Sequence, residues 1–147
     1  MAISFYAEKV KVPNFRRRTV SEWIRTVAQH YGKQVGDVAY QFCDDETILD
    51  FNRKYLQHDY YTDIITFDQS VEDMIFADII ISTETVHTNA QEYQRPYEEE
   101  LLRVIIHGIL HTCGLNDHTE QEQQAMRAAE QHALELLPAN KQELWRK

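Results

Sequence analysis

Residues 100–118 read ELLRVIIHGILHTCGLNDH, and this stretch predicts a helix that is apolar on almost every face. Pro96 stands where a helix favours its first residue, and the acidic run from Glu98 to Glu100 suits the positive end of the helix dipole. Leucine, valine and isoleucine then recur around the circumference until Gly114, where the helix can end. Because such a helix is stable only when it is buried, we expect it at the centre of the fold.

The segments around this helix alternate between strand and helix patterns. Apolar and β-branched runs predict strands at 2–7, 37–43, 62–68 and 76–82. The last two strands are expected to form a hairpin-like pair. Helical spacing predicts four further helices, at 19–31, 44–56, 82–93 and 119–138. The sequence therefore predicts one α/β domain of the α+β type over residues 1–147, in which about five helices cover a small mixed four-stranded sheet.

Two of these helices are expected to begin at capping boxes. Thr19 is followed three residues later by Glu22, and Thr119 by Glu122. In each pair the hydroxyl and the carboxylate can accept the backbone N–H groups that a helix start leaves free. The first helix is therefore predicted to begin at Thr19 and the last at Thr119.

Composition is that of an ordinary globular protein. Of the 147 residues 43% are hydrophobic and 27% are charged, and no apolar run is long enough to cross a bilayer. The start of the chain lacks the pattern of a signal peptide. Cys43 and Cys113 form no CxxC motif, so we expect reduced thiols and a cytoplasmic location.

The charge is unevenly distributed along the chain. Residues 1–36 carry seven Lys or Arg against two Glu, a net charge of +5, and the remainder carries −14, which gives −9 in total. An acidic chain does not favour broad, non-specific binding to nucleic acid. Within NFRRRT, however, Arg16, Arg17 and Arg18 can hold phosphates. A solvated turn of three arginines is the alternative.

Three of the seven histidines lie within residues 107–118. His107 and His111 are four residues apart, so on a helix they stand on the same face, one turn from each other. This spacing allows two imidazoles to reach one metal ion. Gly114 lets the chain leave the helix, and the loop after it can bring His118 to the same ion. Three protein ligands would leave a fourth position for a reactive water molecule.

Gly108 bears on the kind of metal enzyme. The HExxH motif on the metal helix of zincin-type peptidases places a glutamate, the general base, directly after the first histidine. Here that position is Gly108, so peptide hydrolysis is disfavoured although the helix is zincin-like in its histidine pair. A glycine there also indicates that another backbone segment or a substrate approaches closely.

Three blocks of the sequence resemble one known family. HGILHTCGLNDH resembles the HGxLHxxGxDH signature of the YbeY family of bacterial endoribonucleases, which mature ribosomal RNA. FNRKYLQHDYYTDIITFD is similar to that family's LNxxYRxxDxxTDVLSF block, and ADIIISTETVHTNAQEY to its GDIxIS block and the following helix. The resemblance covers residues 51–118. It implies one Zn²⁺ ion held by three histidines, an endoribonuclease specific for single-stranded RNA, and a role at the small ribosomal subunit in maturation of the 16S rRNA 3′ end.

Two positions depart from the family pattern. Asp117 occupies the place of the third histidine, and His118 follows one residue later. We predict His118 as the third metal ligand, with Asp117 as a chemically competent substitute. The family's arginine in the YRxxD segment falls on Leu56, so a guanidinium that could clamp the phosphate is absent there. Arg53, one helical turn earlier, can replace it or can simply face solvent.

The resemblance leads to a predicted mechanism and RNA-binding surface. Zinc held by His107, His111 and His118 would polarise a phosphate oxygen and lower the pKa of a bound water. Attack by the 2′-hydroxyl of the RNA, with the metal stabilising the developing charge, is the alternative route. His107, His111 and Arg53 are the predicted catalytic residues. Single-stranded RNA is expected to lie beside the sheet, with its phosphates on Arg16, Arg17 and Arg18 and its bases stacked on Tyr60 and Tyr61. No membrane partner and no specificity for DNA are expected.

Two other functions stay open. Leu56 favours a zinc-containing ribosome assembly factor without catalytic activity. The helical histidine pair is also compatible with a metallohydrolase of another substrate class, against which Gly108 and the other family-like blocks argue. Among the remaining carboxylates, Asp63 is expected to cap a strand, and Glu130 to lie on a solvated face of the last helix.

Overall fold

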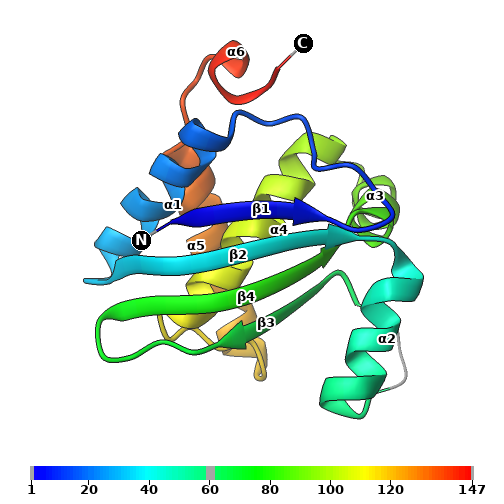
Figure 1. Ribbon diagram of the computed structural model, residues 1–147. Helices are drawn as coiled ribbons and strands as arrows, with labels where there is room; N and C mark the ends of the chain where they lie inside the picture. The colour runs from blue at the N-terminus through cyan, green and yellow to red at the C-terminus, as the bar shows by residue number, and fades with distance from the viewer. Residues whose placement is uncertain (1, 59–61, 147) are drawn as a thin grey trace.

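A four-stranded mixed sheet supports the molecule (Figure 1). In spatial order its strands are β1 (Ile3–Ala7), β2 (Gln34–Cys43), β4 (Met74–Ser82) and β3 (Ile64–Asp68). β1, β2 and β4 run parallel, and β3 pairs antiparallel with β4, as the hairpin prediction requires. This computed structural model describes residues 2–58 and 62–146.

The helices cover both faces of the sheet unequally. α1 (Arg17–His30), α4 (Tyr97–Thr112) and α5 (Glu120–Glu135) lie on one side (Figure 1). α2 (Asp45–Leu56) packs on the opposite face over β3 and β4, α3 (Thr83–Glu92) follows β4 and packs on α4, and the short α6 (Lys141–Leu144) contacts α1. The predicted α+β arrangement is confirmed, with a sixth, four-residue helix in addition. Within the described part of the chain, none of these helices has the length and apolar character to cross a membrane.

The predicted central helix is α4. Eleven of its sixteen residues are buried, and its isoleucines join Ile75, Ile79 and Ile81 of β4 in the main apolar core. The hydroxyl of Tyr40, on β2, donates a buried hydrogen bond of 2.9 Å to the carbonyl of Ile105. Because a fully buried hydroxyl needs a partner, this bond fixes α4 against the middle of the sheet.

The start of α1 differs from the sequence prediction. The helix begins at Arg17 after an N-cap at Arg16 that lacks a side-chain hydrogen bond, so the Thr19 capping box is wrong. The backbone N–H of Arg16 donates to the carbonyl of Leu144 at 2.6 Å, and Phe15 forms a bridge with Trp145. The C-terminal segment therefore fixes the chain before Thr19 is reached. The Thr119 capping box of α5 is confirmed.

Gly108 lies where α4 touches the sheet. A Cβ atom at this position would lie 3.1 Å from Cδ1 of Ile79 and 3.2 Å from both Cδ1 of Ile64 and Oγ1 of Thr66. A close approach is therefore present at Gly108, but side chains of β3 and β4 make it, and not the backbone segment or substrate that the sequence analysis expected. Since Gly108 directly follows His107, this contact also sets the height of the histidine pair above the sheet.

Replacing Gly108 by valine is expected to lower the free energy of unfolding by about 1–3 kcal/mol, because the branched side chain overpacks the contact with β3 and β4. Alanine is expected to change it by less than about 1 kcal/mol, since better helix propensity offsets a smaller clash. Urea unfolding of both variants measures the difference. Equal stability of the valine variant and the wild type would contradict the observed packing.

Candidate metal centre

Three side chains from α4 and the loop after it converge on one point. Nε2 of His107 and Nε2 of His111 are 3.0 Å apart, and Oδ2 of Asp117 lies 3.5 Å from the first and 3.4 Å from the second. The spacing of four residues puts the two imidazoles on one face of α4, as the sequence predicted. Gly114, with φ +101°, then reverses the chain so that Asp117 faces them. The three groups could hold one metal ion.

Hydrogen bonds on the far side of each imidazole ring determine which of its two nitrogens carries the proton. Nδ1 of His107 lies 2.6 Å from Oε2 of Glu130, and Nδ1 of His111 lies 2.9 Å from the carbonyl oxygen of Leu115. A carboxylate and a carbonyl only accept, so both Nδ1 atoms carry the proton and donate it. The neutral rings then present bare Nε2 lone pairs to each other and to Asp117. This is the tautomer that binds metal ions through Nε2.

Glu130 links the histidine pair to a buried arginine. Its carboxylate is 8% exposed, and its Oε1 lies 3.6 Å from Nη1 of Arg103, one turn before His107 on α4. The expectation that Glu130 lies on a solvated face is therefore wrong. Met126 and Ala133, four residues before and three after it, are both buried and mark this face of α5 as the inner one. That spacing is the signal by which the sequence could have placed Glu130.

Burial and charge act in opposite directions on His107. Burial by itself lowers its pKa, because the charged ring loses solvent. The hydrogen bond and negative charge of Glu130 outweigh burial, and Asp63 and Asp117 add to the effect, so the pKa of His107 lies above its ordinary value. Burial also raises the pKa of Asp63. Asp63 thus belongs to the same group of carboxylates, beyond the strand-capping role expected for it.

A cleft of about 470 Å³ opens beside His107. Its floor is α4, one wall is the end of α3 with the turn after it, and the other wall is α5. The lining residues are Asp63, Asn89, Tyr93, Arg95, Glu100, Arg103, Val104, His107, Asp117, Gln123, Met126, Arg127 and Glu130. Because His107 and Asp117 both line the cleft, a molecule bound in it would touch the candidate centre.

The structure does not bring His118 to the histidine pair. Among residues 2–58 and 62–146, the group of possible metal ligands contains Asp117 and omits His118, which is exposed. His118 follows Asp117 directly in the chain, but its exposed side chain does not belong to this group. Asp117, predicted as the substitute ligand, is therefore the third member of this group of possible ligands.

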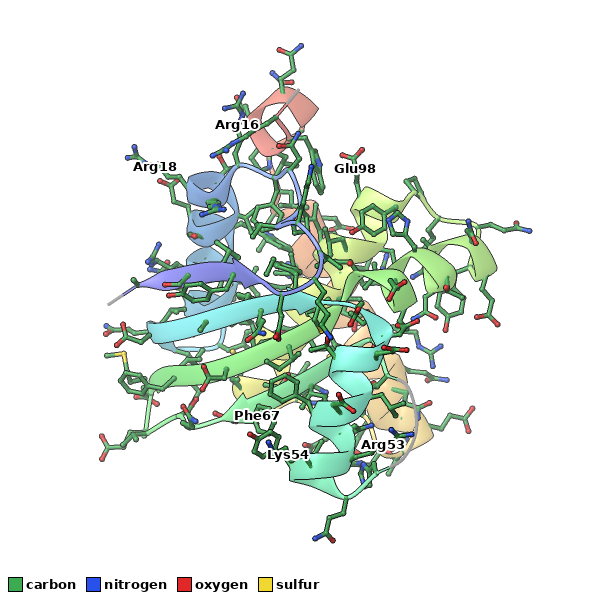
Figure 2. The ribbon with its side chains drawn as sticks, turned by 45° about the vertical axis from the view of Figure 1, so that its right-hand side comes forward. Arg16, Arg18, Arg53, Lys54, Phe67 and Glu98 are labelled. Atoms are coloured by element: carbon green, nitrogen blue, oxygen red, sulfur yellow. The ribbon has the colours of Figure 1, made fainter. Side chains whose placement is uncertain are left out.

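The other predicted site residues lie apart from this cleft. Figure 2 shows Arg16 and Arg18 at the end of the molecule that carries α6, and Arg53 on α2 at the opposite end. Arg16 donates from Nε to the carbonyl of Gln142 at 2.8 Å, and Arg18 pairs with Glu22 at 3.3 Å.

None of Arg16, Arg17, Arg18 and Arg53 lines the cleft within the described parts of the chain. Their roles in RNA binding and catalysis stay predictions. Tyr60 and Tyr61, the predicted stacking residues, lie outside the described residues.

The fold and this cluster define a class of protein: a mixed α/β domain whose buried helix presents two histidines, opposite an aspartate, as possible metal ligands. The family model described as Endoribonuclease YbeY matches residues 2–138. The chain belongs to the YbeY family. The resemblance seen at residues 51–118 is therefore confirmed and extends over almost the whole sequence.

Relatives from several bacteria support this membership. A protein of Parabacteroides distasonis named Endoribonuclease YbeY is 53% identical over 138 residues, which cover 94% of this chain and 97% of the relative. A protein of the same name from Christiangramia forsetii is 44% identical over 134 residues, which cover 91% of this chain and 93% of the relative. A Thermotoga maritima protein with a known solution structure shares the fold, with a TM-score of 0.65 and 23% identity. The match covers 92% of this chain and 88% of that protein.

Removal of the Glu130 carboxylate is expected to destabilise the metal-free protein. In Glu130→Ala the buried guanidinium of Arg103 loses one partner and Nδ1–H of His107 loses its acceptor, which costs about 1–3 kcal/mol of unfolding free energy. Glu130→Gln retains an acceptor and is expected to lose less. The measurement is urea unfolding in the presence of a chelator.

Glu135→Ala is the matched control, because Glu135 is exposed on the same helix and its loss should stay within about 0.5 kcal/mol. If Glu130→Ala and Glu135→Ala unfolded at the same urea concentration, the buried network would contribute no stability.

Proposed function

We propose that this chain is a zinc-dependent endoribonuclease that cleaves single-stranded RNA. One observation carries the proposal: Nε2 of His107, Nε2 of His111 and Oδ2 of Asp117 converge on one point beside a cleft. Family membership adds the substrate class, because relatives aligned over nearly their full length are named Endoribonuclease YbeY. The two lines of support are independent, since one is geometric and the other is sequence similarity.

Zinc suits the three ligand atoms. Tetrahedral zinc bonds imidazole nitrogen and carboxylate oxygen at about 2.0–2.1 Å, which separates neighbouring ligand atoms by about 3.3 Å. The separations of 3.0, 3.4 and 3.5 Å lie close to this value. Two neutral Nε2 atoms at 3.0 Å also repel each other unless a cation or a proton lies between them. We therefore propose His107, His111 and Asp117, rather than His118, as the ligands.

Residues around the proposed zinc site orient its ligands and leave room for an RNA phosphate. When bound, zinc would supply a Lewis acid that polarises a phosphate oxygen and acidifies a water molecule. Glu130 and the Leu115 carbonyl hold the two imidazoles in the tautomer that binds metal, and the cleft admits the substrate beside them. A Zn²⁺ ion bound by two neutral imidazoles and one carboxylate would carry a net charge of +1, and this charge favours binding of an anionic phosphate.

The proposed substrate is the 3′ end of 16S ribosomal RNA in its precursor, with the small ribosomal subunit as the partner and the cytoplasm as the compartment. This part of the proposal rests on the family motifs within residues 51–118. It assigns the chain to ribosome biogenesis.

A second candidate is a zinc-containing assembly factor that does not cut RNA. Leu56 favours it, because its side chain, 40% exposed at the end of α2, provides no cation where the family carries an arginine. A peptidase is disfavoured, since Ile64 and Ile79 fill the space beside Gly108 where the general base of HExxH would begin. Cleavage assays decide between nuclease and assembly factor.

Replacing Asp117 by alanine is expected to weaken zinc affinity by more than about 100-fold, beyond the range typical of a group that only supports a ligand. His118→Ala is the matched control and should bind zinc as the wild type does. Competition with a chromophoric chelator measures both constants. Retained affinity in Asp117→Ala together with lost affinity in His118→Ala would overturn the proposed ligand set.

His111→Ala is expected to abolish cleavage of a single-stranded precursor rRNA fragment while the variant remains folded. The wild type, purified in the same way, should cut the fragment, and a chelator should stop it until Zn²⁺ is restored. Gel analysis of 5′-labelled RNA detects the products. Equal cutting by the variant and the wild type would place the activity elsewhere. Zinc binding without cutting by the wild type would favour the assembly factor.

A further inference from the structure

The cleft beside the candidate centre contains three arginines that differ in their partners. Arg95 pairs with Glu100 at 3.1 Å between Nη1 and Oε1. Arg103, on the floor, lies 3.8 Å from Glu100 and 3.6 Å from Glu130. Both guanidinium groups are therefore neutralised by carboxylates, and neither offers a whole charge to a ligand.

Arg127 is the exception. Its side chain is on the exposed side of the α5 wall, where Nε donates to the backbone carbonyl of Gln123 at 3.4 Å. Within residues 2–58 and 62–146 no carboxylate lies at ion-pair distance from its guanidinium. Arg127 stands three residues before Glu130, so the two side chains lie on the same face of α5. Because Glu130 contacts His107, a full positive charge lines the cleft about one helical turn from the candidate centre.

The opposite wall carries an exposed aromatic ring. Tyr93, directly after α3, is 55% exposed and lines the same cleft as Arg127. The guanidinium carbon of Arg95 lies 5.4 Å from the centre of its ring and holds the ring on one side. An aromatic ring fixed in this way is a platform on which a base can stack.

We infer that Arg127 and Tyr93 form a nucleotide subsite of the proposed endoribonuclease, in which Arg127 binds an RNA phosphate next to the candidate centre and Tyr93 stacks a base. The inference rests on the proposed function and extends it to residues that the sequence motifs do not mark. Arg127 also supplies a guanidinium to the site, which Leu56 cannot provide. A protein with a net charge of −9 needs such a local cation, since its overall charge repels RNA.

The size of the cleft indicates which RNA can enter. Its volume of about 470 Å³ lies in the range of pockets that enclose a small molecule. A single unpaired nucleotide fits such a space, whereas a base pair cannot place one base on Tyr93 without opening. The subsite therefore selects single-stranded RNA.

The test uses the zinc-loaded full chain and a labelled, unstructured oligoribonucleotide. In Arg127→Ala we expect KM to rise by about tenfold or more, because a charged hydrogen bond to phosphate is lost. The slope of log affinity against log salt concentration should decrease in magnitude by about 0.7, the value for one phosphate contact on a single strand. Arg146→Ala, which removes the same charge from an exposed position at the C-terminal end, should change neither quantity.

For Tyr93 we expect a change in KM without a change in the salt slope. Tyr93→Ala should raise KM by about fivefold or more with no change in the salt slope, because stacking involves no counterion release. Tyr93→Phe keeps the ring and should restore the wild-type KM. A salt slope and KM equal to the wild type in Arg127→Ala, or a Tyr93→Phe variant as impaired as Tyr93→Ala, would overturn the subsite.

The outcomes separate this inference from the proposed function. If the wild type cuts RNA and loses activity in His111→Ala, but Arg127→Ala keeps both KM and salt slope, only the subsite fails. If the wild type binds RNA without cutting it, the nuclease proposal fails. The RNA affinity of the same variants is then measured by fluorescence anisotropy at several salt concentrations. A salt slope of Arg127→Ala that is smaller than that of the wild type supports the subsite, and an equal slope overturns it.

Discussion

The burial of α4 against β3 and β4 is the constraint on which the rest of the structure depends. Ile105, Ile106 and Ile109 are fully buried, so the axial position and rotation of the helix are set by core packing. Gly108 permits the close approach to the sheet. Because His107 and His111 belong to the same rigid turns, packing of the core also positions the imidazoles. A site built on such a helix needs little further ordering when it binds an ion.

The surroundings of the histidine pair come from distant parts of the chain. Glu130, from α5, fixes the ring of His107 and is itself paired with Arg103. The loop after α4 returns the carbonyl of Leu115 to His111 and the carboxylate of Asp117 to both rings. The cluster is thus rich in negative charge around two neutral imidazoles, which is the electrostatic balance that a divalent cation satisfies.

Sequence patterns among residues close together in the chain predicted the structure correctly. The all-round apolar character of α4, the hairpin of β3 and β4, the Thr119 capping box and the i, i+4 histidine pair all agree with the structure. Each depends on residues close in sequence. The start of α1 did not agree, because Arg16 and Phe15 pair with the C-terminal segment. Glu130 was also misjudged, since its partner His107 is 23 residues away.

The sequence by itself determined the fold class, the central helix, the family resemblance and the face on which two histidines meet. The physical reason is that helix periodicity and strand alternation follow from local backbone geometry. Tertiary structure alone decided that Asp117 rather than His118 meets the pair, that Glu130 contacts His107, and that Arg127 and Tyr93 line one cleft. These arrangements depend on how the loop after α4 reverses and on how α3 and α5 pack against α4. Neither is encoded in the spacing of neighbouring residues.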